Sequence, residues 1–173
     1  FRRGYSDLRG KYRSCEAVIG DTRHNGGGWL HDDLATLLDG EGYIRFEPRG
    51  QYIGTEPYNK WTKPSCVLIG EDNYSDACGF PYVYKTLGIG KLIGAPVPGT
   101  MTAVWWENQI DPSIVFGIPQ VGALGVKEGR YLENMQIEPD ILVYNDPASV
   151  LRGEDRQLEA AVKEMLKTID SNK

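Results

Sequence analysis

SCVLIGEDNYSDACGFPYVYKTLGIGKLIG, residues 65–94, is the stretch that decides the fold. A compact apolar run is followed by a polar turn, a helical pattern that ends at a glycine, and a second apolar run. Short apolar runs bounded by turn residues favour buried strands, and a glycine after a helical pattern marks the helix C-terminus. The stretch therefore predicts a strand at 65–69, a turn at 70–74, a helix at 75–87 and the start of a strand at 91–94. Such a unit is typical of parallel, right-handed connections.

The same order of elements precedes this unit. Residues 16–21 predict a short buried strand, residues 22–28 form a glycine-rich loop, and a helical pattern runs from Trp29 to just before Gly40. Repeated strand and helix units indicate an α/β fold with a mostly parallel sheet. No linker or internal repeat divides the chain, so we expect residues 1–173 to form one domain.

The remaining segments are expected to decorate this sheet. Residues 43–63 are rich in Gly, Pro and Tyr and predict a surface excursion that could border a binding cleft. Residues 101–145 contain short β-like runs. A closing amphipathic helix is expected to begin at Asp146-Pro147 and to pack on the sheet. Its apolar stripe contains Leu158, Ala161, Val162, Met165, Leu166 and Ile169.

Composition argues against several classes of partner. The chain is 40% hydrophobic and 25% charged, and its net charge is −5. Its basic residues are scattered along the sequence, so we expect no positive footprint for nucleic acid. The most apolar stretch, residues 112–126, is interrupted by polar residues and is shorter than the roughly 18 residues that a membrane helix needs. We therefore expect no membrane span.

Metal and cofactor sites are also not expected. Three widely spaced cysteines suit neither a disulfide framework nor a zinc site, and two histidines are too few for a multi-histidine metal centre. The glycines of residues 88–94 precede a strand instead of following one, and Leu92 stands where a phosphate loop needs Ser or Thr. Both nucleotide-binding motifs are thus rejected, and we expect no metal and no cofactor.

The loop Asn25-Gly26-Gly27-Gly28 lies between a predicted strand and a predicted helix. Three glycines there let backbone amides approach a ligand and face developing negative charge, as in half of an oxyanion hole. A tight turn that needs positive φ explains the same triplet, and the triplet alone favours that simpler interpretation.

Ser75 lies at a second strand-to-helix junction, beside Asp76. A hydroxyl at a helix N-terminus, near free amides and the positive end of the helix dipole, is a plausible nucleophile. A plain N-cap is the local alternative. Two such junctions in one parallel sheet could, however, place the amides of Gly27 and Asp76 around one carbonyl oxygen.

Three motifs together resemble a known family: DTRHNGGG at 21–28, VLIGEDNYSD at 67–76 and LGIGKLIG at 87–94. Their order and spacing resemble the catalytic core of tricorn-type and C-terminal processing serine peptidases. The match continues through YLEN at 131–134 and EPD at 138–140 to the final helix. It covers nearly all of the chain.

The resemblance implies a crotonase-like (ClpP/crotonase) α/β spiral of strand and helix units, and endopeptidase chemistry by acyl transfer. It makes Ser75 the nucleophile and the backbone amides of Gly27 and Asp76 the oxyanion hole. In the tricorn branch a serine and a glutamate orient the histidine base, and the glutamate corresponds to Glu133. From the residues alone, Glu133 could equally be a solvated loop carboxylate.

The rest of the glycine-loop motif is expected to lie beside the substrate. This group comprises Gly26, Gly28 and His24. His24 fills a variable position of the motif, and His31 lies on the helix that follows. For both histidines the residues alone favour a surface imidazole.

Two departures from the family pattern concern the general base. Processing peptidases use a lysine some 20 to 25 residues after the serine. Here no lysine occurs between Lys91 and Lys127, and Pro96 lies near the expected place. The tricorn branch takes its histidine from an upstream subdomain, and neither His24 nor His31 aligns with it. We therefore expect the base to come from residues outside this chain.

The leading hypothesis is the C-terminal catalytic core of a larger peptidase that cleaves peptide or protein substrates through an acyl-enzyme on Ser75. The alternative is a non-catalytic peptide-binding module that retains the oxyanion pocket. A crotonase-fold acyl-CoA enzyme is disfavoured, because its chemistry does not require the nucleophile that Ser75 supplies.

The sequence says less about processing, cellular location and assembly state. It opens at Phe1 without a Met or a signal-peptide pattern, which suggests a mature product or an excised piece. Family resemblance suggests the bacterial periplasm or cell envelope, although the cysteines support neither compartment. Formation of a homo-oligomer is left open.

Overall fold

The computed structural model describes residues 2–172. Its centre is a four-stranded sheet in the order β1-β4-β5-β10, and all three pairings are parallel. The strands are β1 (Val18–Asp21), β4 (Ser65–Ile69), β5 (Lys91–Gly94) and β10 (Ile141–Leu142). The α/β fold with a mostly parallel sheet is therefore confirmed.

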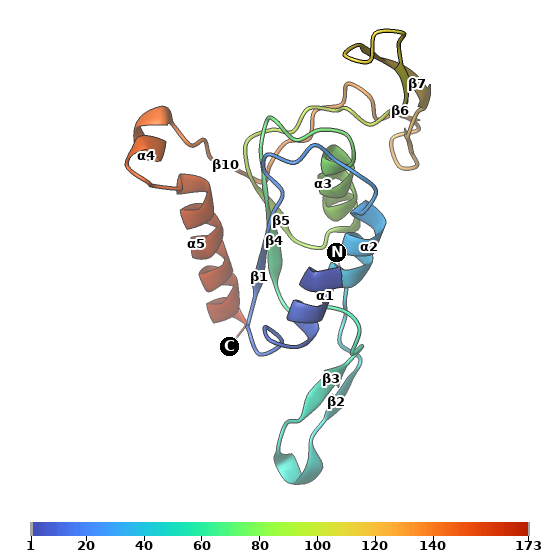
Figure 1. Ribbon diagram of the computed structural model, residues 1–173. Helices are drawn as coiled ribbons and strands as arrows, with labels where there is room; N and C mark the ends of the chain where they lie inside the picture. The colour runs from blue at the N-terminus through green and yellow to red at the C-terminus, as the bar shows by residue number, and fades with distance from the viewer. Residues whose placement is uncertain (1, 173) are drawn as a thin grey trace.

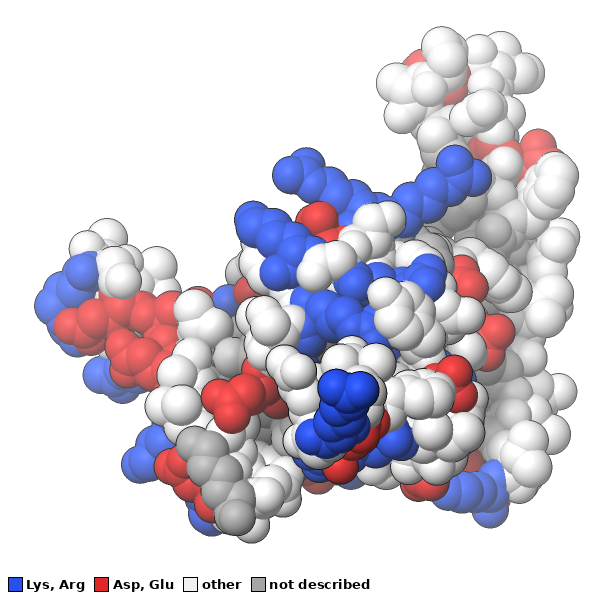
Figure 2. Space-filling view, turned by 90° about the horizontal axis from the view of Figure 1, so that it is seen from below, with Lys and Arg blue, Asp and Glu red and all other residues white. Residues whose placement is uncertain are grey.

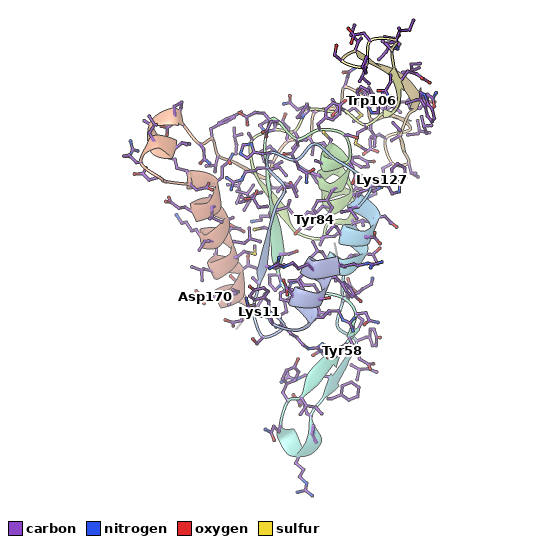
Figure 3. The ribbon with its side chains drawn as sticks, in the orientation of Figure 1. Lys11, Tyr58, Tyr84, Trp106, Lys127 and Asp170 are labelled. Atoms are coloured by element: carbon purple, nitrogen blue, oxygen red, sulfur yellow. The ribbon has the colours of Figure 1, made fainter. Side chains whose placement is uncertain are left out.

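Helices cover both faces of this sheet (Figure 1). The faces of β4 alternate, so Val67 and Ile69 pack toward α3 (Asp76–Leu87) while Cys66 and Leu68 pack toward α5 (Arg156–Ser171). All five residues of β4 are buried, as expected for the central strand of a parallel sheet. In Figure 3, Tyr84 of α3 lies inside the body of the molecule.

The predicted strand, helix, strand unit is present with nearly the predicted bounds. α3 begins one residue after Ser75 and ends at Gly88, which adopts the left-handed conformation (φ 71°) that favours glycine at a helix C-terminus. β4 and β5 pair in parallel, with Cys66 opposite Lys91. The first unit is also present, because β1 precedes α2 (His31–Leu38) and pairs with β4.

Two antiparallel hairpins project from the body in Figure 1. One consists of β2 (Ile44–Phe46), the 3-10 turn η1 (Pro48–Gly50) and β3 (Gly54–Glu56), which confirms the surface excursion at 43–63. The other pairs β6 (Ala103–Asn108) with β7 (Val115–Val121), and Trp106 on it is exposed (Figure 3). β8 (Leu124–Gly125) and β9 (Arg130–Tyr131) form a further short antiparallel pair.

The closing helix differs from its prediction in two ways. Asp146 and Pro147 begin a separate helix, α4 (Pro147–Leu151), and α5 starts only after Asp155. Gly153, with φ 76°, breaks the path between them, and the Asp155 carboxylate caps α5 by accepting from the Leu158 amide at 3.0 Å. Of the predicted stripe, Ala161 and Met165 are buried, whereas Leu158, Val162 and Leu166 are exposed.

Two further differences concern the N-terminal part. α1 (Arg2–Arg9), a short helix with no buried residue, has no counterpart among the predicted elements. The expected helix start at Trp29 is wrong, because α2 begins at His31. Trp29 and Leu30 lie in the preceding loop and are exposed.

Candidate active site

Ser75 occupies a strained turn between β4 and α3. Its φ is 56° and its ψ is −122°, a conformation that L-residues other than glycine rarely adopt. A serine on a sharp strand-to-helix turn presents its hydroxyl outward, as a nucleophile elbow does. Ser75 is the N-cap residue of α3 by position, but its hydroxyl makes no capping hydrogen bond to that helix.

The glycine loop packs directly on this turn. A Cβ added to Gly27 would lie 2.7 Å from the Tyr74 carbonyl oxygen, 2.8 Å from Ser75 Cβ and 2.9 Å from the Asp76 amide nitrogen. No larger residue fits there, and the φ of Gly27, 96°, also favours glycine. The Tyr74 amide donates to the Asn25 carbonyl at 3.0 Å, which fastens the two segments together. The structure thus brings together the three residues expected around one carbonyl oxygen.

The two expected oxyanion donors differ in their present partners. The Gly27 amide donates to the Asn25 side-chain oxygen at 2.8 Å. For the Asp76 amide, the described residues provide no acceptor. The Asp76 amide is therefore free to donate to a ligand, whereas the Gly27 amide can do so only after the Asn25 side chain moves away. Gly26 and Gly28 face open space.

The Asp76 carboxylate ties the glycine loop to α3. It accepts from the Leu30 amide at 2.7 Å and pairs with His31 Nδ1. His31 is therefore a partly buried partner of Asp76 and not a free surface imidazole. The Trp29 and His31 rings contact edge to face, with centroids 5.9 Å apart.

His24 lies at the other side of the turn. Its Nδ1 pairs with Asp72, and its backbone amide donates to the same carboxylate at 3.3 Å. Burial raises the pKa of Asp72 and the bonds from His24 lower it, so that the net pKa lies below its ordinary value. The His24 side chain is largely exposed, as the sequence predicted.

Arg23 anchors the base of the glycine loop, a role that the sequence did not indicate. Its guanidinium bonds Asp21 at 2.7 Å and Asp155 at 2.8 Å. The guanidinium is the main cause that lowers the pKa of both carboxylates. The loop is thereby attached to the end of β1 and to the start of α5.

Glu133 is not a free solvated carboxylate. Its Oε2 accepts from the Met101 amide at 2.8 Å, the Thr102 amide at 2.7 Å and the Thr102 hydroxyl at 2.7 Å. Burial raises the pKa of Glu133, but these three hydrogen bonds lower it, and the net pKa lies below its ordinary value. The carboxylate is therefore ionised at neutral pH and fixes the segment at 101–102.

Thr100 links that segment to Ser75, a role that no local sequence pattern indicates. Its hydroxyl oxygen accepts from the Ser75 amide at 3.0 Å and lies 3.2 Å from Cys78 Sγ. Thr100 directly precedes Met101, whose amide donates to Glu133. The Glu133 carboxylate is therefore connected to Ser75 through Met101 and Thr100. Buried Asn73 braces the same turn by donating to the Ala77 carbonyl at 3.0 Å.

The described residues contain no group of three or more His, Cys, Asp and Glu side chains that could hold a metal ion. Across residues 2–172, each helix is too short or too polar to cross a membrane. Within the same range no side chain hydrogen-bonds the Ser75 hydroxyl, so the structure shows no general base for it.

These features define a family. The sequence profile of Peptidase family S41 matches residues 1–143, and the chain belongs to this family. The resemblance found in the sequence is thereby confirmed.

Among relatives, the tricorn protease of Thermoplasma acidophilum is 25% identical over 156 residues, which is 90% of this chain and 15% of that protein. The tricorn protease homolog of Saccharolobus solfataricus is 26% identical over 156 residues, covering 89% of this chain and 14% of that protein. The chain thus spans about a seventh of the curated tricorn proteases that it matches.

Solved structures share the fold. The crystal structure of the tricorn protease superposes with a TM-score of 0.78 at 24% identity, covering 90% of this chain and 15% of that one. Mature CPAF superposes with a TM-score of 0.73 at 16% identity, covering 98% and 47% of the two chains. The photosystem II D1 C-terminal processing protease gives a TM-score of 0.53 at 15% identity, covering 83% and 38%.

Proposed function

We propose that this chain is the catalytic core of a serine peptidase that cleaves peptide bonds through an acyl-enzyme on Ser75. The observation that carries the proposal is the strained Ser75 turn with Gly27 packed against it. A residue held at such a backbone conformation costs about 1–3 kcal/mol, and strain of this kind concentrates at functional sites. Membership of Peptidase family S41 supports the same reaction class.

The reaction would proceed in two steps. The Ser75 oxygen attacks the substrate carbonyl carbon while its proton passes to a general base, and the carbonyl oxygen becomes an oxyanion. The amides of Asp76 and Gly27 donate to this oxyanion, the Gly27 amide after it leaves Asn25. The C–N bond then breaks, the amine leaves with the proton, and water hydrolyses the acyl ester to release the acid and regenerate the Ser75 hydroxyl.

The general base is proposed to come from outside this chain. Neither histidine is bonded to Ser75, because His24 pairs with Asp72 and His31 pairs with Asp76. Glu133 is proposed to orient the incoming base. Its Oε2 is fully engaged, while Oε1 accepts no hydrogen bond from the described residues.

We also propose that residues 1–173 form one C-terminal domain of a larger enzyme and that its strand and helix units follow the crotonase-like spiral. Peptides or proteins would be its substrates. The bacterial envelope is the proposed location, on family resemblance alone.

One observation favours a second function. The missing base is also what a peptide-binding module without catalysis would show, with the Asp76 amide receiving a carbonyl or carboxylate of the bound peptide. In that case Ser75 would need no activation.

A labelling experiment separates the two. The full-length protein is treated with a fluorophosphonate probe, and the modified peptide is identified by mass spectrometry. A catalytic Ser75 is labelled and hydrolyses an unstructured peptide, and Ser75→Ala abolishes both signals. Ser113→Ala, an exposed serine on the β6–β7 hairpin, serves as the control and retains both. Absence of label and turnover with intact peptide binding would select the binding module.

A further inference from the structure

A cavity lies well away from Ser75. It has a volume of about 500 Å³, is partly open to solvent and is lined by the end of α1, the turn after it, β3 and the segment at 57–63. Trp61 and Lys63 precede β4, whereas Ser75 follows it, so the cavity and the nucleophile lie beyond opposite ends of that strand. The cavity therefore belongs to no part of the proposed peptidase site.

Positive charge lines this cavity. Four of its lining residues are basic and none is acidic; the basic ones are Arg9, Arg13, Lys60 and Lys63. In Figure 2, which views the molecule from below, Lys and Arg side chains gather near the centre of this face. These four basic residues, which are separated in the sequence, thus converge in the fold, although the net charge of the chain is −5.

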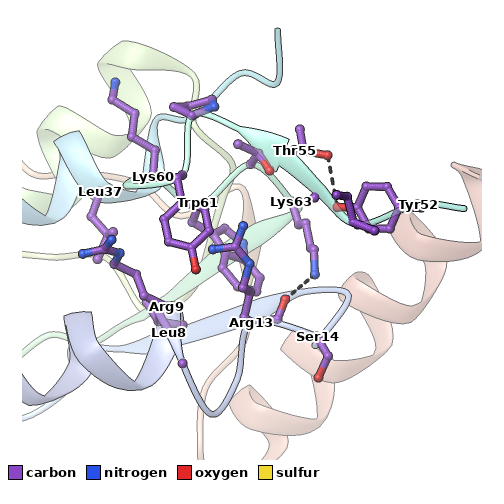
Figure 4. Close-up of a pocket in the computed structure, with 16 residues that line it drawn as sticks. Leu8, Arg9, Arg13, Ser14, Leu37, Tyr52, Thr55, Lys60, Trp61 and Lys63 are labelled. Carbon is purple, nitrogen blue, oxygen red and sulfur yellow. Dashed lines mark hydrogen bonds between the residues drawn. The ribbon is translucent and has the colours of Figure 1, made fainter. Parts of the chain in front are cut away.

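Arg9 and Arg13 are held by aromatic rings instead of carboxylates. The guanidinium carbon of Arg13 lies 3.6 Å from the centroid of the Tyr58 ring, and that of Arg9 lies 5.4 Å from it. Figure 4 shows both arginines on the side of the cavity that α1 and the turn after it form. Among the described residues, neither arginine has a carboxylate within ion-pair distance.

Their hydrogen-bonding capacity is mostly unused. Arg9 donates one bond, to the Tyr5 hydroxyl at 3.0 Å, and its buried Nε has no acceptor. The Arg13 guanidinium donates to no group in residues 2–172. Buried donors are nearly always satisfied, so an unsatisfied guanidinium nitrogen indicates an acceptor that is absent from the chain itself.

Hydrogen bonds from the two lysines hold the walls of the cavity in place. Lys63 donates to the carbonyl oxygens of Arg13 and Cys15, each at 2.6 Å, and thereby fixes the turn that carries the Arg13 side chain (Figure 4). Lys60 donates to the Asp39 carbonyl at 3.0 Å. Trp61 is buried and donates its indole N–H to the Pro64 carbonyl at 3.2 Å. The arginines are thus presented by walls that are already in place.

We propose that this cavity binds an oxyanion, a carboxylate or phosphate group, carried on an apolar or aromatic body. Guanidinium groups stacked on aromatic rings keep their planar N–H donors free, and this donor geometry matches carboxylates and phosphates. A volume of this size is typical of sites for small organic ligands. The rings of Tyr58 and Trp61 would contact the apolar part of the ligand. Binding would occur independently of the peptidase chemistry.

The test uses three probes of similar size: phenyl phosphate, benzoate and uncharged phenol. Each is titrated into the purified full chain while the Trp61 indole N–H is followed by NMR, and affinities are measured by calorimetry. We expect saturable shifts at Trp61 with at least one anion and at least tenfold weaker binding of phenol. Preference for phenyl phosphate identifies a phosphate ligand, and preference for benzoate identifies a carboxylate such as a peptide terminus.

Variants locate the site. Arg13→Gln and Arg9→Gln should each weaken binding of the preferred anion at least tenfold, and Arg13→Lys should restore only part of the loss. Arg130→Gln, which removes an exposed guanidinium on β9, is the matched control and should change affinity less than twofold. Unchanged NMR spectra away from the cavity show that each variant is folded. Equal binding of phenol and the anions, no shift at Trp61, or an equal loss in Arg130→Gln would overturn the proposal.

Discussion

Gly27→Ala is the change that most directly tests the proposed geometry. The added Cβ would lie below 3.0 Å from three atoms, the Tyr74 carbonyl oxygen, Ser75 Cβ and the Asp76 amide nitrogen. Two of these atoms are backbone, which cannot swing aside as a flexible side chain would. The left-handed φ of 96° adds a second penalty.

The two penalties can be sized separately. Overpacking by one methyl group costs typically 1–3 kcal/mol, about the same as a non-glycine residue held in a disfavoured conformation. A total of about 2–6 kcal/mol is comparable with the whole stability of a small domain. We therefore expect the loop to move away from Ser75 and to take the Gly27 amide out of the proposed oxyanion site. Loss of one oxyanion donor lowers turnover by about 10²–10³-fold.

The neighbouring glycines are matched controls. Gly26→Ala meets no atom within 4 Å and has no positive φ, so its melting temperature should stay close to that of the parent. Gly28→Ala has open space but a φ of 151°, which isolates the conformational penalty. Peptide hydrolysis by the full-length enzyme and thermal unfolding are the two measurements. Turnover above half of the parent value in a folded Gly27→Ala enzyme would refute the packing argument.

Glu133→Gln should lower turnover more than it changes KM. Because the pKa of Glu133 is lower in the folded state than in the unfolded chain, its contribution to stability is present near neutral pH and is lost as pH falls through that lowered pKa. The melting temperature should therefore change less with acidification in the variant than in the parent, and identical acid profiles would contradict this role of Glu133. Thr100→Val leaves the Ser75 amide without its acceptor and should destabilise the protein by about 1–3 kcal/mol with a loss of turnover. Thr100→Ser keeps the hydroxyl and should restore both stability and turnover. Denaturant unfolding that cannot distinguish the two variants would contradict this prediction. Residues 1–173 expressed alone should fold yet hydrolyse peptides near background, because a missing general base costs roughly 10²–10⁴-fold, and ordinary turnover that is abolished by Ser75→Ala would instead point to His24 or His31 as the base.

Local sequence patterns correctly predicted the elements whose residues all share one kind of environment. β4 matches its predicted bounds because a strand buried on both faces must be apolar throughout. The turn at Gly88 was predicted because a left-handed helix end needs glycine. The closing helix was misplaced because Asp146 and Asp155 both carry capping signals, and the stripe alone did not show that Gly153 separates them.

The site was predictable only in part. Ser75 and the glycine loop carry local signals, a polar residue at a helix start and a glycine triplet. The acceptor role of Thr100 depends on a chain reversal that brings it to a residue 25 positions away, and no local pattern encodes that. The same reason explains why the His31 and Asp76 pair, 45 residues apart, was not foreseen.

At position 75 the proposed catalytic role of the serine conflicts with the stability of the domain. A glycine would adopt φ 56° without the penalty that serine incurs, so Ser75→Gly should make the domain more stable while removing the hydroxyl. Mutational screens that reward only folding would therefore favour loss of the serine. A stabilised variant of this domain selected without an activity assay is at risk of being an inert scaffold.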